Sequence, residues 1–248
     1  MITLSNVHKS FNGNIVLNGV NLTISEGEML ALIGRSGIGK SVLLKHIVGL
    51  IKPDAGDILI DGININRLRG KELEAIRKRF GFLFQEGALF DSLTVYDNVA
   101  FPLREKTSLS EEMIREKVFC ELENMGLEKD AHKYPAELSG GMRKRAALAR
   151  AMVMQPSIML FDEPTTGLDP IIGQSILNYI QACHKRGGFT GIIVTHDVPR
   201  VFSIVQRIAM LHDGNIILIG TYEHIIQEKN PIFEQFLSGN LNGPLTYS

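Results

Sequence analysis

An apolar run, a glycine-rich loop and the start of a helix follow one another in Met29-Leu30-Ala31-Leu32-Ile33-Gly34-Arg35-Ser36-Gly37-Ile38-Gly39-Lys40-Ser41. The five apolar residues predict a strand that is buried on both faces, as in a parallel sheet. The eight residues that follow match the pattern G-x-x-x-x-G-K-[ST], and the chain beyond them predicts a helix from Ser41 to Leu50. A strand, a loop of this pattern and a helix in this order predict a phosphate-binding loop.

The residue types of this loop suit phosphate chemistry. Glycines let backbone N–H groups turn inward around phosphate oxygens, and the N-terminus of the helix adds positive potential. We expect Lys40 to reach the β- and γ-phosphates and the Ser41 hydroxyl to hold Mg²⁺. The alternative is a glycine-rich turn with an exposed lysine. The residues expected to contact the nucleotide are Gly34, Arg35, Ser36, Gly37, Ile38, Gly39, Lys40, Ser41 and Val42.

A second apolar run, Ile158 to Phe161, leads directly into the acidic pair Asp162-Glu163. A phosphate-binding loop needs a carboxylate that organises the metal ion, and Asp162 is expected to hold the Mg²⁺ shell. Glu163 is expected to orient and polarise an attacking water. Because an acidic pair after a strand can also be a helix cap, this interpretation depends on the loop at 34–41.

A third segment, Leu138-Ser139-Gly140-Gly141-Met142, precedes a helix predicted from Met142 to Val153. Two glycines at a helix N-terminus expose backbone N–H groups, which makes a second place for an anion. Four basic residues on this helix are interpreted as a solvated face with at most a structural ion pair: Arg143, Lys144, Arg145 and Arg150.

The remaining pattern is that of an α/β protein. The first 65 residues predict short strands, with one at Ile2 to Val7, a pair in Ile15 to Ile24 that is interrupted by Asn18-Gly19, and a hairpin turn at Asp61-Gly62. The middle of the chain is mostly helical, and Ser110 is a predicted N-cap. Strands and helices then alternate to Ile219, which implies a mainly parallel sheet.

Composition limits the classes of protein that fit. The chain has 248 residues, a formal net charge of −1, 44% hydrophobic residues and 21% charged residues, which indicates one globular domain with an appended lobe. The balanced charge gives no support to nucleic-acid binding. Two cysteines are too few for a disulfide framework, which favours a reducing cytosol. We find neither a signal peptide nor a membrane-spanning apolar run.

Together the three segments resemble the ATP-binding subunits of ABC transporters, and the resemblance covers nearly the whole chain. It implies a P-loop NTPase (RecA-like) core with an N-terminal antiparallel β subdomain and an α-helical signature subdomain. The implied domain covers 1–238, with the helical subdomain at about 88–155, and 239–248 form a C-terminal extension. The implied activity is hydrolysis of ATP with Mg²⁺ in a homodimer, where Ser139, Gly140 and Gly141 of one subunit close over the nucleotide of the other.

The resemblance also implies roles for single residues. Gln85 corresponds to the glutamine that senses Mg²⁺, so that the implied metal-binding residues are Ser41, Gln85 and Asp162. His196 corresponds to the histidine that contacts the γ-phosphate, and the implied catalytic residues are Glu163, His196 and Lys40. Asp169 falls at the cross-dimer contact. Phe11 either stacks on adenine or only packs.

Six aromatic residues gather between positions 80 and 101, and part of this cluster is expected in the core. In the family the same region forms a groove for a helix of the membrane subunit. The six residues are Phe80, Phe82, Phe84, Phe90, Tyr96 and Phe101.

Three features resemble the Mla/Mce phospholipid-transport branch, the MlaF-like ATPases. They are the run from Leu83 to Glu105, Met142 in the signature, and the C-terminal Phe233 to Gly239 followed by Asn242-Gly243-Pro244. This branch implies phospholipid transport by an integral-membrane permease, with a Mce-domain lipid-binding subunit and a STAS-domain protein in the same complex. It also implies a peripheral location on the cytoplasmic side of the inner membrane, and a tail that reaches the other ATPase subunit.

Three alternatives share part of the pattern. The ATPase of an amino-acid or ion importer has every catalytic motif and differs in the branch features. A non-transport ABC protein usually has a second cassette, a long coiled-coil insertion or zinc motifs, which this sequence lacks. A metabolic P-loop kinase explains the loop at 34–41 but not Leu138 to Met142 or His196.

Overall fold

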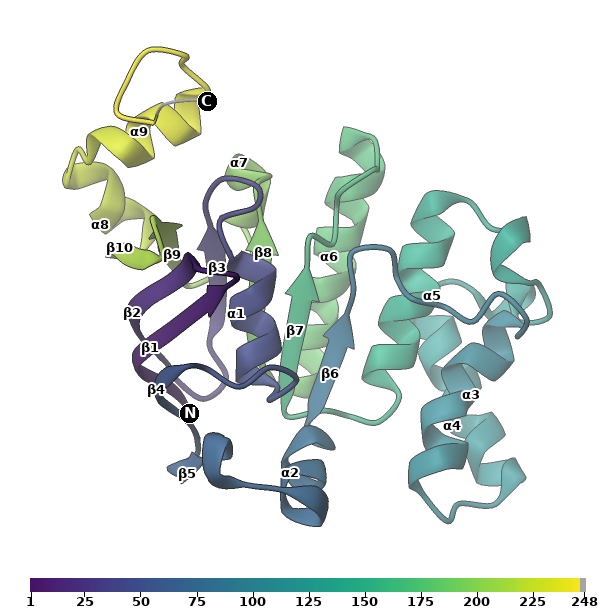
Figure 1. The fold of residues 1–248 in the computed structure, drawn as a ribbon. Coiled ribbons are helices and arrows are strands. Elements are labelled where there is room, and N and C mark those ends of the chain that lie inside the picture. Colours follow the sequence, from purple (N-terminus) through teal and green to yellow (C-terminus); the bar gives the residue numbers. More distant parts are fainter. Residues whose placement is uncertain (246–248) are drawn as a thin grey trace. The chain divides into compact units, whose positions relative to one another are not determined.

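The computed structural model describes residues 1–245, and the chain forms two compact units (Figure 1). Unit 1 consists of Met1–Arg77 and the chain from Thr190 onward, and unit 2 is Lys78–Phe189. Within residues 1–245, no helix is both long and apolar enough to cross a membrane.

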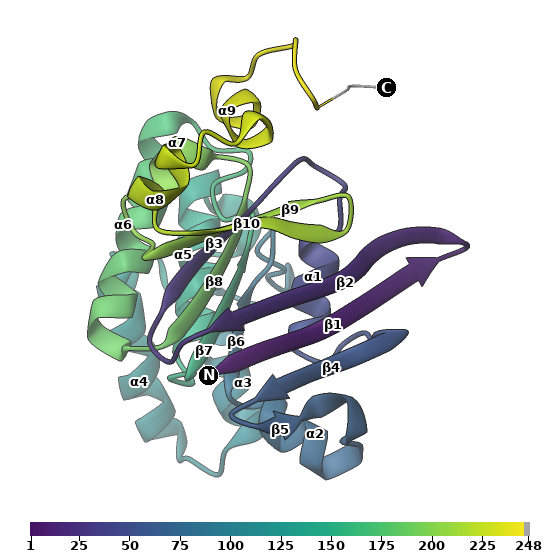
Figure 2. The same ribbon diagram turned by 90° about the vertical axis from the view of Figure 1, so that its left-hand side faces the viewer.

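The first sheet of unit 1 is antiparallel, as the resemblance implies for the N-terminal subdomain. Its strand order is β2-β1-β4-β5, and Figure 2 shows the first three side by side. Asp61 and Gly62 both have positive φ, as a type I′ hairpin turn requires, so the predicted turn is confirmed. The strands are β1 (Ile2–Phe11), β2 (Asn14–Ile24), β4 (Ala55–Ile60) and β5 (Ile63–Asn64).

The N-terminal hairpin corrects one prediction. The turn lies at Asn12-Gly13, where both residues have positive φ, and β2 then runs unbroken to Ile24. Asn18-Gly19 does not interrupt a pair of strands. The register shifts from Val7↔Val20 to His8↔Asn18, which leaves Gly19 as the extra residue of a β-bulge. The same dipeptide therefore makes a turn at one site and a bulge at the other.

The central strand of unit 1 is β3 (Met29–Ile33), and all five of its residues are buried, as predicted. It pairs in parallel with β8 (Thr190–Thr195) and β9 (Arg207–His212), and β9 pairs antiparallel with β10 (Asn215–Gly220). The helices of unit 1 are α1 (Lys40–Ile47), α2 (Gly70–Arg77), α7 (Val198–Val201), α8 (Tyr222–Gln227) and α9 (Pro231–Ser238).

The C-terminal tail folds back on α9 of its own chain. Gln235 is buried, and its Nε2 donates to the carbonyl oxygens of Asn240 at 3.0 Å and Leu245 at 3.1 Å. Its Oε1 accepts from the Leu245 N–H at 2.6 Å. The described part of the tail thus makes contacts within one chain, and residues 246–248 of the expected extension lie outside the described residues.

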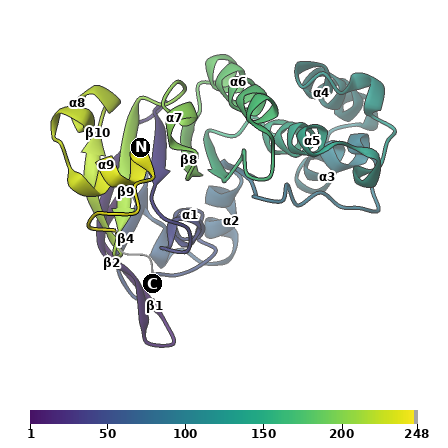
Figure 3. The ribbon, with the colours of Figure 1, turned by 90° about the horizontal axis from the view of Figure 1, so that it is seen from above.

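Unit 2 pairs β6 (Phe80–Leu83) in parallel with β7 (Ile158–Asp162) and contains four helices. Ser110 Oγ accepts from the Met113 N–H at 3.3 Å, so the predicted N-cap is confirmed. Figure 3 shows α3, α4 and α5 close together, and α5 also packs on α6. The helices are α3 (Val95–Lys106), α4 (Glu111–Asn124), α5 (Gly140–Met152) and α6 (Pro170–Gly187).

Candidate active site

The glycine-rich loop leaves β3 in a conformation that two of its glycines make possible. Gly34 has φ +145°, and a Cβ there would lie 2.5 Å from the backbone oxygen of Leu211. Gly39 has φ +106°, and its Cβ would lie 2.6 Å from Val16 Cγ1. Real Cβ atoms do not approach other atoms so closely, so the loop can take this path only with glycine at both positions.

Lys40 is buried at the first position of α1, which excludes the turn with an exposed lysine. Its Nζ donates to the backbone oxygens of Gly34 at 2.7 Å and Arg35 at 2.8 Å, so the ammonium lies across the start of the loop. The N-cap residue Gly39 has no side chain that could cap the backbone N–H groups of the first turn. Both features suit an anion held at this helix N-terminus.

The loop borders a hollow of about 410 Å³ in unit 1. A Cβ on Gly37 would meet no atom within 4 Å, so the loop backbone is open to an incoming group at this point. The backbone N–H groups of such a loop suit phosphate oxygens, and the hollow lies beside them. The hollow is lined by Ile15, Val16, Asn18, Gly37, Ile38, Asp213 and Gly214.

Two further predicted residues of unit 1 lie on the surface. Phe11 lies at the tip of the β1–β2 hairpin with 41% of its surface exposed, and Lys9 Nζ lies 5.2 Å from its ring centroid. Phe11 is therefore not a core residue, and stacking on adenine stays a prediction. His196 is exposed directly after β8, where the adjacent Thr195 Oγ1 accepts from the Asp197 N–H at 2.9 Å.

In unit 2, β7 ends in two buried carboxylates, Asp162 and Glu163. Glu163 has φ +50°, an uncommon conformation for a residue with a side chain, and such strain concentrates at functional sites. Thr166 Oγ1 donates to Glu163 Oε2 at 3.2 Å and thereby fixes the carboxylate. The next helix begins only at Pro170, with Asp169 as its N-cap, so the pair is not a helix cap.

The Ser139–Gly141 segment packs against the start of α6. Ser139 is the N-cap of α5, and its Oγ accepts from the Met142 N–H at 3.3 Å. A Cβ on Gly141 would lie 2.7 Å from Ile172 Cγ2, so glycine permits this close approach. Asp169 caps α6 by accepting from the N–H groups of Ile171 and Ile172, both at 3.0 Å. Within unit 2, the structure brings the Ser139–Gly141 segment next to the start of α6. Ser139 is the N-cap of α5, and Asp169 is the N-cap of α6.

The interpretation of the basic residues of α5 as a solvated face was wrong for Lys144, which is buried, whereas Arg143 is exposed as expected. All four donate to backbone carbonyl oxygens, and none forms an ion pair within residues 1–245. Arg143 donates to Leu138, Lys144 to Gln85, Arg145 to Met125 and Gly126, and Arg150 to Gly87 and Ala88. Lys144 is buried, and burial lowers its pKa. Sequence patterns miss this arrangement because carbonyl partners leave no signal in side-chain identity.

The aromatic cluster lines a groove of about 490 Å³ in unit 2. Phe82 stacks on Phe84 at 4.1 Å between ring centroids, and Phe90 lies 4.8 Å from Phe101. Tyr96 does not line the groove, and its ring centroid lies 5.7 Å from that of Phe119. The remaining lining residues are Lys78, Phe80, Gly81, Ala88, Pro102, Lys106, Arg150, Ala151 and Met154.

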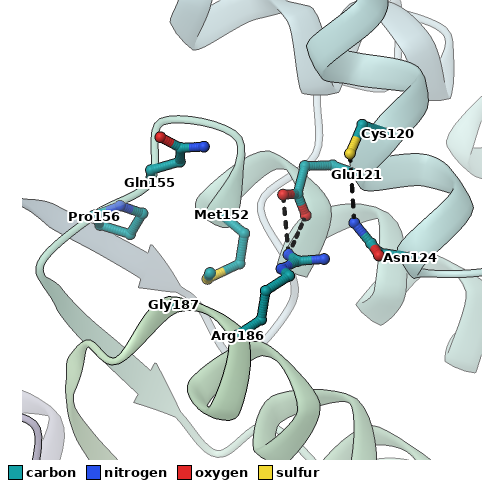
Figure 4. Close-up of a pocket in the computed structure, with 8 residues that line it drawn as sticks. All are labelled: Cys120, Glu121, Asn124, Met152, Gln155, Pro156, Arg186 and Gly187. Carbon is teal, nitrogen blue, oxygen red and sulfur yellow. Dashed lines mark hydrogen bonds and ion pairs between the residues drawn. The ribbon is translucent and has the colours of Figure 1, made fainter.

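A second hollow of unit 2, of about 360 Å³, lies between α4 and α6 and contains no predicted site residue (Figure 4). Arg186 Nη2 donates to both carboxylate oxygens of Glu121, at 2.9 and 2.8 Å. Figure 4 shows this ion pair between the two helices, with Cys120 and Asn124 at one side. We interpret the pair as a structural brace.

Ser41 of unit 1 and Gln85 and Asp162 of unit 2, the residues expected to hold Mg²⁺, each carry an oxygen donor. Ser41 is half-buried, the Gln85 side chain is exposed, and the Asp162 carboxylate is buried. Within residues 1–245, no three His, Cys, Asp or Glu side chains gather as a metal site. Hydroxyl, amide and single carboxylate oxygens fit Mg²⁺, which usually takes one or two carboxylates together with phosphates and water.

Comparison with known proteins gives consistent results. A family profile described as "ABC transporter" matches residues 17–166. The intermembrane phospholipid transport system ATP-binding protein MlaF of Haemophilus influenzae is 43% identical over 247 residues, which cover 100% of this chain and 94% of that protein. The probable ribonucleotide transport ATP-binding protein mkl of Mycobacterium bovis is also 43% identical, over 100% of this chain and 69% of that protein. A dimeric post-hydrolysis structure of the ATP-binding cassette MJ0796 with ADP and Pi has a TM-score of 0.82 and 36% identity, over 89% of this chain and 98% of that chain.

Proposed function

The chain belongs to the ABC transporter family of ATP-binding subunits, and on this premise we propose that it is the ATPase of a phospholipid transporter. The observation that carries the proposal is the full-length similarity to a phospholipid-transport ATPase, combined with a phosphate loop whose glycines and lysine are fixed by their surroundings. The proposed cofactors are ATP and Mg²⁺.

The proposed chemistry assigns one task to each group. Lys40 and the backbone N–H groups of 34–41 would bind the β- and γ-phosphates, and His196 would contact the γ-phosphate. Ser41, Gln85 and Asp162 would hold Mg²⁺, which supplies neutralisation of phosphate charge when bound. Glu163 would orient and polarise the attacking water, and Thr166 holds its carboxylate in place.

The proposed working unit is a homodimer. The MJ0796 cassette is dimeric in the structure that contains ADP and Pi, and this supports the proposal. In the dimer, Ser139, Gly140 and Gly141 of one subunit would close over the nucleotide of the other, and Asp169 would lie at the contact. Closure would move the membrane subunits, and hydrolysis would reopen the pair.

The proposed partners follow from the same branch. They are an integral-membrane permease, a Mce-domain lipid-binding subunit and a STAS-domain protein, with the chain peripheral on the cytoplasmic side of the inner membrane. The aromatic groove at Phe80 to Phe101 is the proposed site for a permease helix. A tail contact to the second subunit would require the tail to leave Gln235 of its own chain.

A ribonucleotide is the second candidate cargo, because the mkl protein of Mycobacterium bovis has the same sequence identity to this chain as the Haemophilus protein, 43%. The chain covers 94% of the Haemophilus protein but 69% of mkl, which favours the phospholipid assignment.

Purification of the intact complex from membranes tests the proposal. We expect a Mce-domain subunit in the complex and phospholipid in an organic extract of it. ATPase activity in vesicles should respond to phospholipid composition and not to added ribonucleotides. A periplasmic amino-acid receptor in the complex, or stimulation by ribonucleotides alone, would overturn the phospholipid assignment.

A further inference from the structure

Side chains on α5 donate hydrogen bonds to the main-chain oxygens of the segment between β6 and α3. Lys144 Nζ donates to the carbonyl oxygen of Gln85, and the guanidinium of Arg150 donates to the carbonyl oxygens of Gly87 at 2.9 Å and Ala88 at 2.7 Å. We call these three contacts the carbonyl clamp. Hydrogen bonds from charged donors are about twice as strong as neutral ones, so the clamp fixes the path of this segment.

The backbone conformation of the clamped segment needs such support. Gly87 has φ +75° and Ala88 has φ +49°, and the second value is uncommon for a residue with a side chain. A Cβ on Gly87 would lie 3.2 Å from Ala147 Cβ, so the segment lies directly on α5. The far end is also fixed, because Asn98 Nδ2 donates to the carbonyl oxygen of Phe90 at 3.0 Å.

Three carboxylates act electrostatically on the Lys144 side chain. Its ammonium is buried, and the charges of Glu86, Asp162 and Glu163 act on it. Asp162, the last residue of β7, is the proposed metal ligand, and Glu163, which follows it, is the proposed water-orienting base. Lys144 therefore donates a hydrogen bond to the main chain at Gln85, and the charges of the three carboxylates favour its ammonium form.

We propose that Lys144 is a positioning residue for hydrolysis, which fixes the main chain at Gln85 and thereby orients the Gln85 side chain toward the metal ion. Arg150 likewise fixes the main chain at Gly87 and Ala88, beside the aromatic groove. Because Ser139 is the N-cap of α5, the clamp connects the Ser139–Gly141 segment with Gln85 and with the groove. This inference rests on the proposed function for the role of Gln85, but the clamp itself does not.

The test compares Lys144→Met with Lys144→Arg and with Arg145→Met in the full chain. The first variant removes the charge and the donor at similar length, and the second keeps both. Arg145→Met is the matched control, because Arg145 is adjacent on α5 but donates to Met125 and Gly126. The first readout is hydrogen–deuterium exchange of 84–90 in the protein without nucleotide or metal, and the second is the half-saturating Mg²⁺ concentration for ATP hydrolysis.

We expect Lys144→Met to speed exchange in 84–90 and to raise the half-saturating Mg²⁺ concentration about tenfold, with ATP affinity unchanged. Lys144→Arg should restore most of both values, and Arg145→Met should speed exchange only around 122–127. Unchanged exchange and unchanged Mg²⁺ dependence in a folded Lys144→Met protein would refute the proposal. If the wild-type chain hydrolyses no ATP, the proposed function fails. The exchange measurement still shows whether Lys144 fixes the main chain of 84–90.

Discussion

At the scale of single residues, Glu163 combines three features of a catalytic base: burial, a left-handed backbone and a hydroxyl donor to its carboxylate. Glu163→Gln keeps the size of the side chain and removes its charge. We expect turnover to fall at least about 100-fold, because general-base catalysis is lost, while ATP affinity stays within about twofold. Single-turnover hydrolysis and a nucleotide titration measure the two quantities, and normal hydrolysis in this variant would exclude the assigned role.

Lys40 is expected to dominate nucleotide affinity. Lys40→Ala removes the ammonium that lies across Gly34 and Arg35, and we expect ATP affinity to fall at least about tenfold. Isothermal titration with Mg²⁺·ATP measures this loss, and a folded variant that binds as tightly as wild type would contradict it.

The loop glycines differ in what they would tolerate. Gly34→Ala would bring a Cβ against the Leu211 backbone oxygen, and we expect the free energy of unfolding to fall by about 3 kcal/mol or more. Gly37→Ala meets no neighbour, so only its positive φ opposes it, at about 1 kcal/mol. Urea denaturation of the two variants compares these costs, and equal losses would contradict the steric argument.

His46 should make stability depend on pH. It is fully buried on α1, its Nδ1 lies 2.7 Å from the Val42 carbonyl oxygen, and within the described residues its Nε2 has no hydrogen-bond partner. Burial lowers the pKa of His46 below 6.5, and the nearby Lys9 charge lowers it further, while the Val42 bond and the Asp54 charge oppose this change. The unfolded chain then binds more protons, so stability should fall as the pH drops below about 6.5, by at most about 1.4 kcal/mol per pH unit from this group.

A non-titrating residue at position 46 provides the control for this dependence. The free energy of unfolding of His46→Gln should change less than that of wild type between pH 7.5 and pH 5.5 in urea denaturation. Equal slopes in the two proteins would exclude His46 as the cause.

At the scale of helices and strands, the sequence could predict most of unit 1 and the site loop, because the signals are local. The buried run at 29–33 and the motif that follows it require nothing beyond their own residues. The interruption at Asn18-Gly19 was wrong because an Asn-Gly pair fits both a turn and a bulge, and the pairing of β1 with β2 decides between them. The carbonyl clamp was missed because it joins positions 144 and 85, and its acceptors are main-chain atoms.

The brace between α4 and α6 gives a prediction at this scale. Glu121→Ala leaves the Arg186 guanidinium without its carboxylate, and we expect the free energy of unfolding to fall by about 1 kcal/mol, since Arg186 is partly exposed. Glu123→Ala, at an exposed position of the same helix, should change it by less than about 0.5 kcal/mol. Thermal or urea unfolding of both variants measures the difference. Equal losses in the two variants would show that the ion pair does not stabilise the fold.

At the scale of the whole molecule, the proposed active site needs a second chain, because Ser139–Gly141 of one subunit would complete the site of the other. The hydrolysis rate per chain should therefore rise with protein concentration until the dimer is populated. Glu163→Gln with ATP should elute as a dimer in size-exclusion chromatography, and Lys40→Ala should not. A rate per chain that is independent of concentration, measured on a protein that stays monomeric, would contradict the homodimer.

The carbonyl clamp has a consequence for how such a protein can diverge. Lys144 and Arg150 recognise main-chain oxygens, which every amino acid carries, so the clamp places no demand on the side chains at 85 and 88. The residues that face the aromatic groove can then change to suit a different permease, while the hydrogen bonds from α5 to the main chain are kept. Partner choice and catalytic timing can evolve separately, although both depend on the segment between β6 and α3.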